Sequence, residues 1–98
     1  MQIDKDQIVK SLLKKGFAEE ACKHHRQFFH IFEGRETGVR TYISHTPSLK
    51  VYGDSLLAKM KHQLRLNSKE DLGDFLNCPM SREQYVEKLI SYGVIRGE

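Results

Sequence analysis

The chain has 98 residues, a formal net charge of +3 and two cysteines, Cys22 and Cys78. This length suits a single domain, 1–98, and two isolated cysteines indicate reduced thiols rather than a disulfide scaffold. The sequence lacks an apolar run long enough to cross a membrane and lacks the basic start and apolar segment of a signal peptide, so we expect a cytoplasmic protein without membrane contact.

Charge is distributed unevenly along the chain. Residues 1–65 carry twelve Lys and Arg against seven Asp and Glu, whereas residues 66–98 carry four against six. The basic part also contains all five histidines. A modest basic excess is typical either of phosphate contacts with nucleic acid or of an ordinary solvated surface.

The first predicted element is a helix that begins near Asp4. Asp4 and Gln7 have the spacing of a capping box, and Gly16 is a suitable residue to end the helix. Four apolar residues repeat on one helical face between these ends: Ile8, Val9, Leu12 and Leu13.

A β-hairpin is predicted next. Residues 25–32 and 36–44 are rich in aromatic and β-branched residues, and Glu33-Gly34 between them resembles a two-residue turn. Side chains alternate between the two faces of paired strands. We therefore expect Phe28, His30, Val39 and Ile43, together with Arg26, on a face that helices cover.

The open face of this hairpin is expected to collect polar side chains. Counting back from the turn pairs Phe28 with Val39, Gln27 with Arg40, and His25 with Tyr42. Phe29 and Ile31 would lie on the same open face, nearer the turn.

The rest of the chain predicts one short strand and three helices. Residues 48–53 have the composition of a third strand, and helices are expected to begin near Asp54 or Ser55, near Asn67 or Ser68, and at Ser81, where Gln84 completes a capping box. The predicted order is α-β-β-β-α with extra C-terminal helices. This order indicates an α+β domain with helices on one face of an antiparallel sheet.

Histidine is the residue on which chemistry at the open face would depend. An imidazole has an ordinary pKa near 6.5, so it can accept a proton from a ribose 2′-hydroxyl or donate one to a leaving oxygen at neutral pH. Arg40 is suited to holding a phosphate. The adjacent His24 and His25 have no Cys or carboxylate ligands at zinc-site spacing, so no metal is expected.

Several short motifs resemble the HicA-like toxins of toxin-antitoxin pairs, in particular a longer subgroup. The resemblance covers about residues 3–90. It is carried by His25-Arg26, Gly34-Arg35-Glu36-Thr37, Val39-Arg40-Thr41, Ser44-His45, and Leu56-Leu57 followed by Met60, Gln63 and Leu64.

The resemblance implies a double-stranded-RNA-binding-domain-like fold with a core of about residues 3–66 and a C-terminal helical extension of about residues 67–95. It also implies a ribonuclease that cleaves messenger RNA without a cofactor and is held inactive by a cognate antitoxin protein. The family's working histidine corresponds to His25, with His24 as the substitute. The segment "ACKHH" lacks the Gly-Ser that often precedes that histidine. The expected RNA-binding residues are Arg26, Gln27, Arg40, Tyr42 and Lys50.

Two other functions remain open from the sequence. Residues 55–77 have the pattern of a helix-turn-helix DNA reader, although Glu70, Asp71 and Asp74 would repel phosphates. A partner-binding module without nucleic acid is the other alternative. Its docking face would be the acidic C-terminal part with Tyr85, Leu89, Ile90 and Tyr92, residues that would equally suit ordinary core packing.

Overall fold

The computed structural model describes residues 2–21, 23, 25–44, 50–77 and 80–95. The helices and strands in this part of the chain confirm the expected α+β class. They are β1 (Ile3–Asp4), α1 (Lys5–Lys14), β2 (Phe17–Ala21), β3 (His25–Phe32), β4 (Arg35–Ser44), β5 (Val51–Tyr52), α2 (Asp54–Gln63), α3 (Lys69–Asn77) and α4 (Arg82–Ser91).

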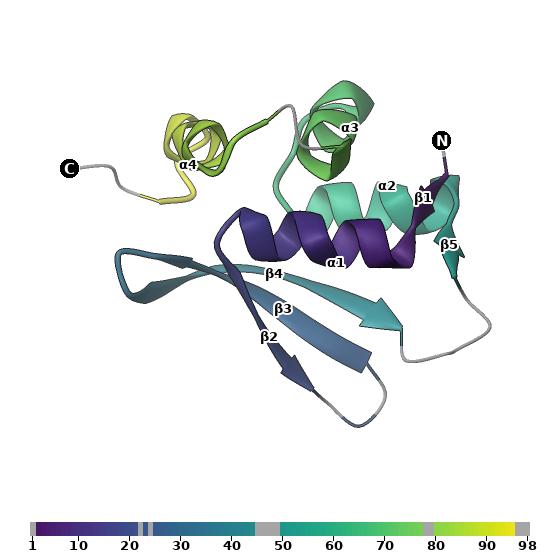
Figure 1. The fold of residues 1–98 in the computed structure, drawn as a ribbon. Helices are drawn as coiled ribbons and strands as arrows, with labels where there is room; N and C mark the ends of the chain where they lie inside the picture. Colours follow the sequence, from purple (N-terminus) through teal and green to yellow (C-terminus); the bar gives the residue numbers. More distant parts are fainter. Residues whose placement is uncertain (1, 22, 24, 45–49, 78–79, 96–98) are drawn as a thin grey trace.

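The elements are arranged in layers on one side of a three-stranded antiparallel sheet. The sheet has the order β2-β3-β4, and β1 pairs separately with β5. Helices α1 and α2 lie over one face of the sheet, and α3 and α4 lie on the same side (Figure 1). Tyr85 of α4 also contacts the sheet directly, at the rings of Phe17 and His30. Among the described residues no helix covers the opposite face, which we call the open face.

One hydrophobic core runs through these layers. Phe28 and Ile43 from the sheet, Leu12 from α1, and Phe75 and Leu89 from the C-terminal helices all belong to it and are fully buried. Tyr85 of α4 is also fully buried, and its hydroxyl donates to the Leu64 carbonyl at 2.8 Å. Tyr85 and Leu89 therefore pack in the core and do not form a docking face.

The third strand of the sheet is not the one that the sequence predicted. It is β2, which pairs with β3 from Phe17↔His30 to Ala21↔Arg26. Residues Val51 and Tyr52 pair instead with Ile3 and Asp4, as a separate two-stranded ribbon. The segment of β2, FAEEA, is short and acidic, as protected edge strands often are, and so lacks the composition that marks a strand.

The hairpin turn is confirmed, but the predicted pairing is wrong beyond it. Phe32 lies opposite Arg35, and both Glu33 and Gly34 have positive φ, as a type I′ turn requires. A bulge between Phe29 and Ile31 then shifts the register. The observed pairs are Phe28↔Thr41, Gln27↔Tyr42 and His25↔Ser44. Because the shift is an even number of residues, each side chain keeps its predicted face.

The predicted helix ends are confirmed for α3, α4 and the end of α1, where Gly16 has a φ of 90°. The predicted caps are wrong at the starts of α1 and α2, and the N-cap of α2 is Gly53 without a side-chain bond. Ser81 and Gln84 form the expected capping box, and Ser68 caps α3 by accepting from the Asp71 amide at 3.1 Å. Asp4 makes no side-chain cap, and the Gln7 side chain donates to the Leu76 carbonyl at 2.8 Å. This bond ties α1 to the end of α3.

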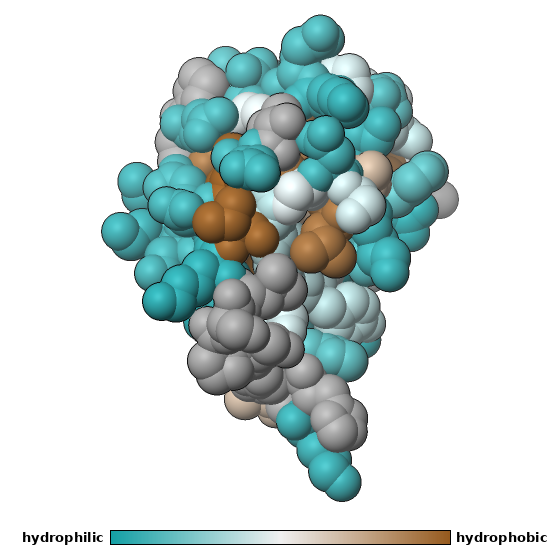
Figure 2. All heavy atoms as spheres, turned by 90° about the vertical axis from the view of Figure 1, so that its right-hand side faces the viewer, coloured by the Kyte–Doolittle hydropathy of each residue, from teal (hydrophilic) through white to brown (hydrophobic). Residues whose placement is uncertain are grey.

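No helix within the described residues is long and apolar enough to span a membrane. The end of the molecule that carries β1 and β5 has a mainly hydrophilic surface with small, separate apolar patches (Figure 2).

Candidate functional site

His25 and Tyr42 form a ring pair at one end of the sheet. His25 is the first residue of β3, and Tyr42 lies on β4 opposite Gln27. Their ring centroids are 5.4 Å apart with an interplanar angle of 74°. Both side chains are exposed, Tyr42 at 41%. A titratable imidazole therefore lies at the surface in edge contact with a phenol.

A groove of about 190 Å³ adjoins this ring pair, and we call it the His25 groove. The His25 and Tyr42 side of the groove faces α2, which contributes Lys59 and Gln63, and Tyr52 of β5 lines it as well. Leu56 and Met60 supply its apolar surface. The groove thus combines an imidazole, two phenols, an ammonium group and an amide.

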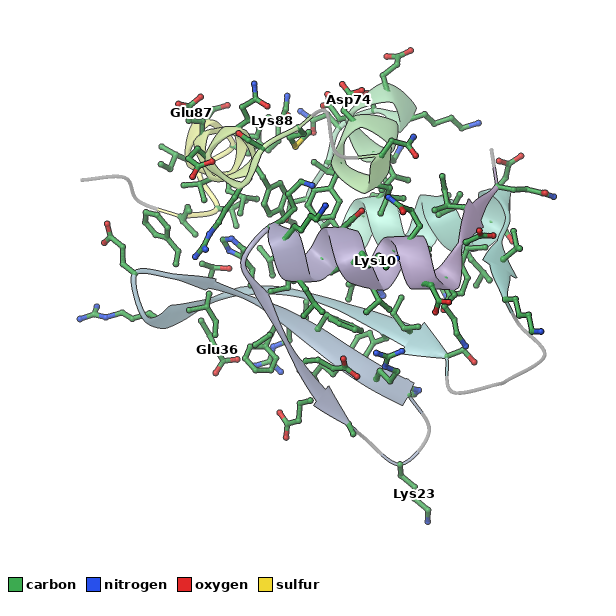
Figure 3. The ribbon with its side chains drawn as sticks, in the orientation of Figure 1. Lys10, Lys23, Glu36, Asp74, Glu87 and Lys88 are labelled. Carbon is green, nitrogen blue, oxygen red and sulfur yellow. The ribbon has the colours of Figure 1, made fainter. Side chains whose placement is uncertain are left out.

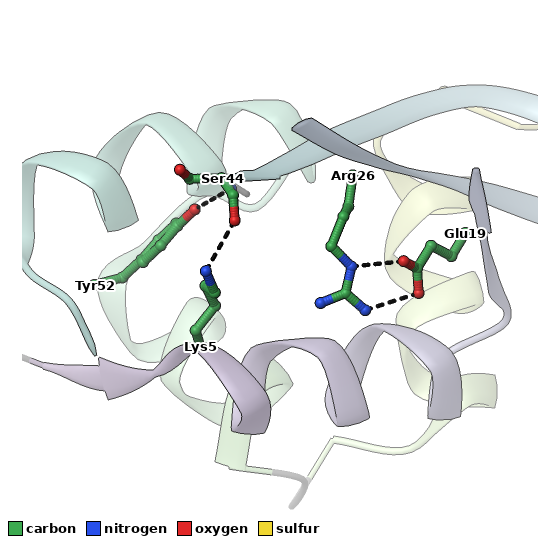
Figure 4. Close-up of polar contacts among 5 residues, drawn as sticks. All are labelled: Lys5, Glu19, Arg26, Ser44 and Tyr52. Carbon is green, nitrogen blue, oxygen red and sulfur yellow. Dashed lines mark hydrogen bonds and ion pairs between the residues drawn. The ribbon is translucent and has the colours of Figure 1, made fainter. Parts of the chain in front are cut away.

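The strand end beneath His25 is held by two polar contacts. Ser44, which pairs with His25, donates its amide to the Tyr52 hydroxyl at 2.9 Å, and its carbonyl accepts from Lys5 Nζ at 2.9 Å (Figure 4). Lys5 begins α1, and its own amide donates to the Lys50 carbonyl at 2.8 Å. Two separate segments, the start of α1 and residues 50–52, therefore hold the backbone next to His25.

A second link joins the sheet to α2. The Thr41 hydroxyl donates to Gln63 Oε1 at 2.6 Å, and Thr41 is fully buried on the helix-covered face. Because Gln63 Oε1 accepts this bond, the side-chain amide of Gln63 has a fixed orientation at the edge of the His25 groove.

Arg40 is on the open face but not beside His25. The bulge places Arg40 opposite Phe29, four residues along β3 from His25, which is about 13 Å at the usual rise of a strand. Its guanidinium lies 3.2 Å from Glu36 Oε1, an exposed ion pair within β4. The predicted proximity of Arg40 to His25 is therefore wrong, whereas Gln27 is half-buried directly opposite Tyr42.

Arg26 lies on the other face and is paired with β2. Its Nε and Nη2 donate to the two carboxylate oxygens of Glu19 at 2.5 and 2.9 Å, and its guanidinium lies 5.5 Å from the centroid of the Phe28 ring (Figure 4). The hydrogen bonds that Arg26 donates to the Glu19 carboxylate raise the pKa of Arg26. Arg26 is consequently engaged in a structural pair and does not line the His25 groove.

The other predicted residues contribute less to this groove. His24 lies outside the described residues, and Lys50 is exposed before β5 without lining the groove. Within the described part of the chain, no group of three His, Cys, Asp or Glu side chains is placed to hold a metal ion.

Sequence reasoning missed Tyr52, Lys59 and Gln63 as groove residues. Lys59 and Gln63 are four residues apart on α2, a spacing that puts both on one helical face. That signal was present in the sequence. The position of the face relative to His25 depends on how α2 packs against β4, which no local pattern specifies.

The described groove is suited to acid-base chemistry on a small polar or phosphate-bearing ligand. An imidazole can exchange a proton with a bound hydroxyl, while an ammonium group and phenols can hold an anion. Comparisons with known protein families, with curated proteins and with solved structures found no match to this chain.

Proposed function

We propose that this chain is a HicA-like toxin of a toxin-antitoxin pair. In this proposal it binds messenger RNA in the cytoplasm, cleaves it without a metal or other cofactor, and is held inactive by a cognate antitoxin protein. The observation that carries the proposal is the contact of His25 with Tyr42 beside a groove that Lys59 also lines.

The arrangement of the elements supports a double-stranded-RNA-binding-domain-like fold. Helix α1 is followed by the three sheet strands β2, β3 and β4, and α2 then returns over the same face as α1. This is the order α-β-β-β-α that the resemblance implies, with a different strand supplying one of the three β elements. Helices α3 and α4 form the C-terminal extension, and their apolar residues join the same core.

In the proposed reaction, the ribose 2′-oxygen attacks the adjacent phosphorus and the bond to the 5′-oxygen breaks. His25 accepts the proton from the 2′-hydroxyl, and the departing 5′-oxygen takes a proton from a donor in the groove or from water. Lys59 and the hydroxyl of Tyr42 stabilise the negative charge that develops on the phosphate oxygens. His24 is the substitute candidate for this role if the protein strand is shifted by one residue.

The two alternatives have weaker support. As a helix-turn-helix reader, the chain would present α3 to DNA, and Glu70, Asp71 and Asp74 lie in the first two turns of that helix. A non-catalytic partner-binding domain is favoured by the open face of the sheet, where Phe29 and Ile31 are only half-buried.

Cleavage of labelled single-stranded and structured RNA in the presence of EDTA tests the proposal. General acid-base catalysis contributes about 10²–10⁴-fold in rate, so His25→Ala should lower the cleavage rate by that factor. The control is Lys10→Ala, because Lys10 is exposed on α1 and lies outside the His25 groove. Expression without a partner should slow growth, and His25→Ala should relieve this effect.

The proposal fails if the wild-type protein leaves both RNAs uncut, or if His25→Ala and His24→Ala variants cut as fast as wild type. RNA binding without cleavage would leave a non-catalytic RNA-binding domain. Tight binding to one duplex DNA sequence, with RNA ignored, would favour the helix-turn-helix alternative.

A further inference from the structure

A second groove, of about 380 Å³, lies at the C-terminal end of α2, and we call it the Arg65 groove. Lys61, His62 and Arg65 supply three basic side chains, and Asn67 supplies an amide. Tyr92 and Val94, which follow α4, also line it. The lining among the described residues contains no carboxylate, and neither Lys61, His62 nor Arg65 has an ion-pair partner there.

Arg65 occupies a backbone position that usually belongs to glycine. Helix α2 ends in a Schellman motif, in which the Arg65 amide donates to the His62 carbonyl at 3.2 Å and the Leu66 amide to the Lys61 carbonyl at 3.1 Å. Arg65 is the residue of this motif in the left-handed region, with φ 63°. A residue with a Cβ is strained there, and glycine is not.

The helix dipole accounts for only part of this basic cluster. Cations in the last turn of a helix are stabilised by the partial negative charge of its C-terminal carbonyls, which suits Lys61 and His62. The helix dipole does not explain why position 65 is an arginine, because glycine would relieve the backbone strain there. The strained backbone of Arg65 at a groove therefore motivates a functional role for its side chain.

Residues of α2 line both the Arg65 groove and the His25 groove. Lys59 lines the His25 groove, and His62 and Arg65 follow it at successive spacings of three residues, all three with exposed side chains. Residues three apart are neighbours on a helix surface. Lys59 and His62 are therefore neighbours on the surface of α2, and Arg65 lies in the turn that ends this helix.

We propose that the Arg65 groove binds backbone phosphates of the same RNA strand that enters the His25 groove. This inference rests on the RNA binding proposed above and adds a second contact site to it. Phosphate is the matching ligand because the groove presents cations and an amide donor without a neutralising carboxylate. The groove between α3 and α4, lined by Asp71, Asp74 and Glu87, would repel the same strand, and it lies on the side of the molecule away from the sheet (Figure 3).

The affinity of the protein for a labelled single-stranded RNA of about 15 nucleotides, measured by fluorescence anisotropy at several salt concentrations, tests this site. All variants carry His25→Ala so that the RNA stays intact. Each phosphate contact on a single strand contributes about 0.7 to the slope of log affinity against log salt. We expect Lys61→Gln with Arg65→Gly to reduce that slope by about 1.4.

The matched control is Lys10→Gln with Lys14→Gln, which removes the same charge from exposed positions of α1 that line neither groove. It should leave the slope unchanged. Arg65→Gly alone should weaken RNA binding while raising the midpoint of thermal unfolding by about 4–8 °C, because it relieves strain in the helix end. If Arg65 had only a structural role, Arg65→Gly would raise the midpoint of thermal unfolding without weakening RNA binding.

Equal slopes for the groove variant and the control variant would overturn the Arg65 site and leave the proposed function standing. If the protein with His25→Ala and the wild-type protein both fail to bind the RNA, the RNA-binding function is wrong and this site falls with it.

Discussion

The imidazole of His30 lies edge to face against the ring of Tyr85, with centroids 5.4 Å apart and an interplanar angle of 89°. This contact joins β3 to α4. The His30 ring also lies 5.1 Å from the Phe17 ring, and its Nδ1 is 3.1 Å from the Thr37 hydroxyl. His30 is fully buried, and its Nε2 has no hydrogen-bond partner among the described residues. The C-terminal helix therefore packs against a histidine whose surroundings favour the neutral ring.

We predict that acid destabilises the fold through His30. Burial, and next the nearby charge of Arg82, lowers the pKa of His30 from 6.5 to about 4. Between these values the unfolded chain binds a proton that the folded chain does not, so stability falls as pH falls. The predicted loss is about 2 kcal/mol between pH 7.5 and pH 5, measured by urea unfolding.

The control for this prediction is His30→Gln, which removes the titrating ring. Its stability should fall less over the same pH interval, although it will be lower than that of wild type at pH 7.5 because the aromatic contacts are lost. Parallel pH curves for the two proteins would show that His30 is not the source of the effect.

Tyr85→Phe tests the bond that ties α4 to the residue after α2. The substitution keeps the buried ring and removes the hydroxyl that donates to the Leu64 carbonyl, leaving that carbonyl unpaired. We predict a loss of about 1–2 kcal/mol in the free energy of unfolding, measured in urea. Tyr92→Phe is the matched control, because Tyr92 is only half-buried, and it should change stability by less than about 0.5 kcal/mol. Equal losses would mean that the Tyr85 bond contributes nothing specific.

The features that sequence predicted correctly depend on local interactions. The turn at Glu33-Gly34 and the capping box of Ser81 and Gln84 each involve residues within a few positions of one another. The faces of β3 and β4 also follow locally, because alternation of side chains does not depend on which residue lies opposite. The assignment of His25 and Tyr42 to one open face was therefore correct despite the wrong pairing.

The features that sequence did not predict depend on packing between distant segments. Strand β2 is recognisable only once β3 is present as its partner, and the Gln7 side chain bonds to Leu76 rather than capping its own helix. The bulge in β4 had one local marker, Gly38, whose φ of 88° is easily adopted only by glycine. Without that bulge, Arg40 would have been two residues closer to His25.

Gly38→Ala tests the role of this glycine in the bulge. A Cβ at Gly38 would meet no atom within 4 Å, so the cost of the substitution is conformational rather than steric. We predict a loss of about 1–2 kcal/mol in the free energy of unfolding. Gly53→Ala is the control, because Gly53 has a φ of −92° and equally open surroundings. Its loss should be smaller, since it comes only from the weaker preference of alanine for the N-cap of α2. The strain argument is wrong if both variants unfold at the same urea concentration.

Arg26 and Arg40 provide a matched pair of charge removals on opposite faces of the sheet. Arg26 is held by Glu19, whereas the Arg40 side chain is 48% exposed on the open face. Arg26→Gln should therefore lower the free energy of unfolding by about 1 kcal/mol and leave RNA affinity unchanged. Arg40→Gln should leave stability nearly unchanged, because its exposed pair with Glu36 contributes little, and should reduce the salt slope of RNA binding by about 0.7. Urea unfolding and anisotropy titrations on the same samples measure both effects. Loss of RNA affinity in Arg26→Gln alone would place the RNA beside β2 and contradict its proposed place at the His25 groove.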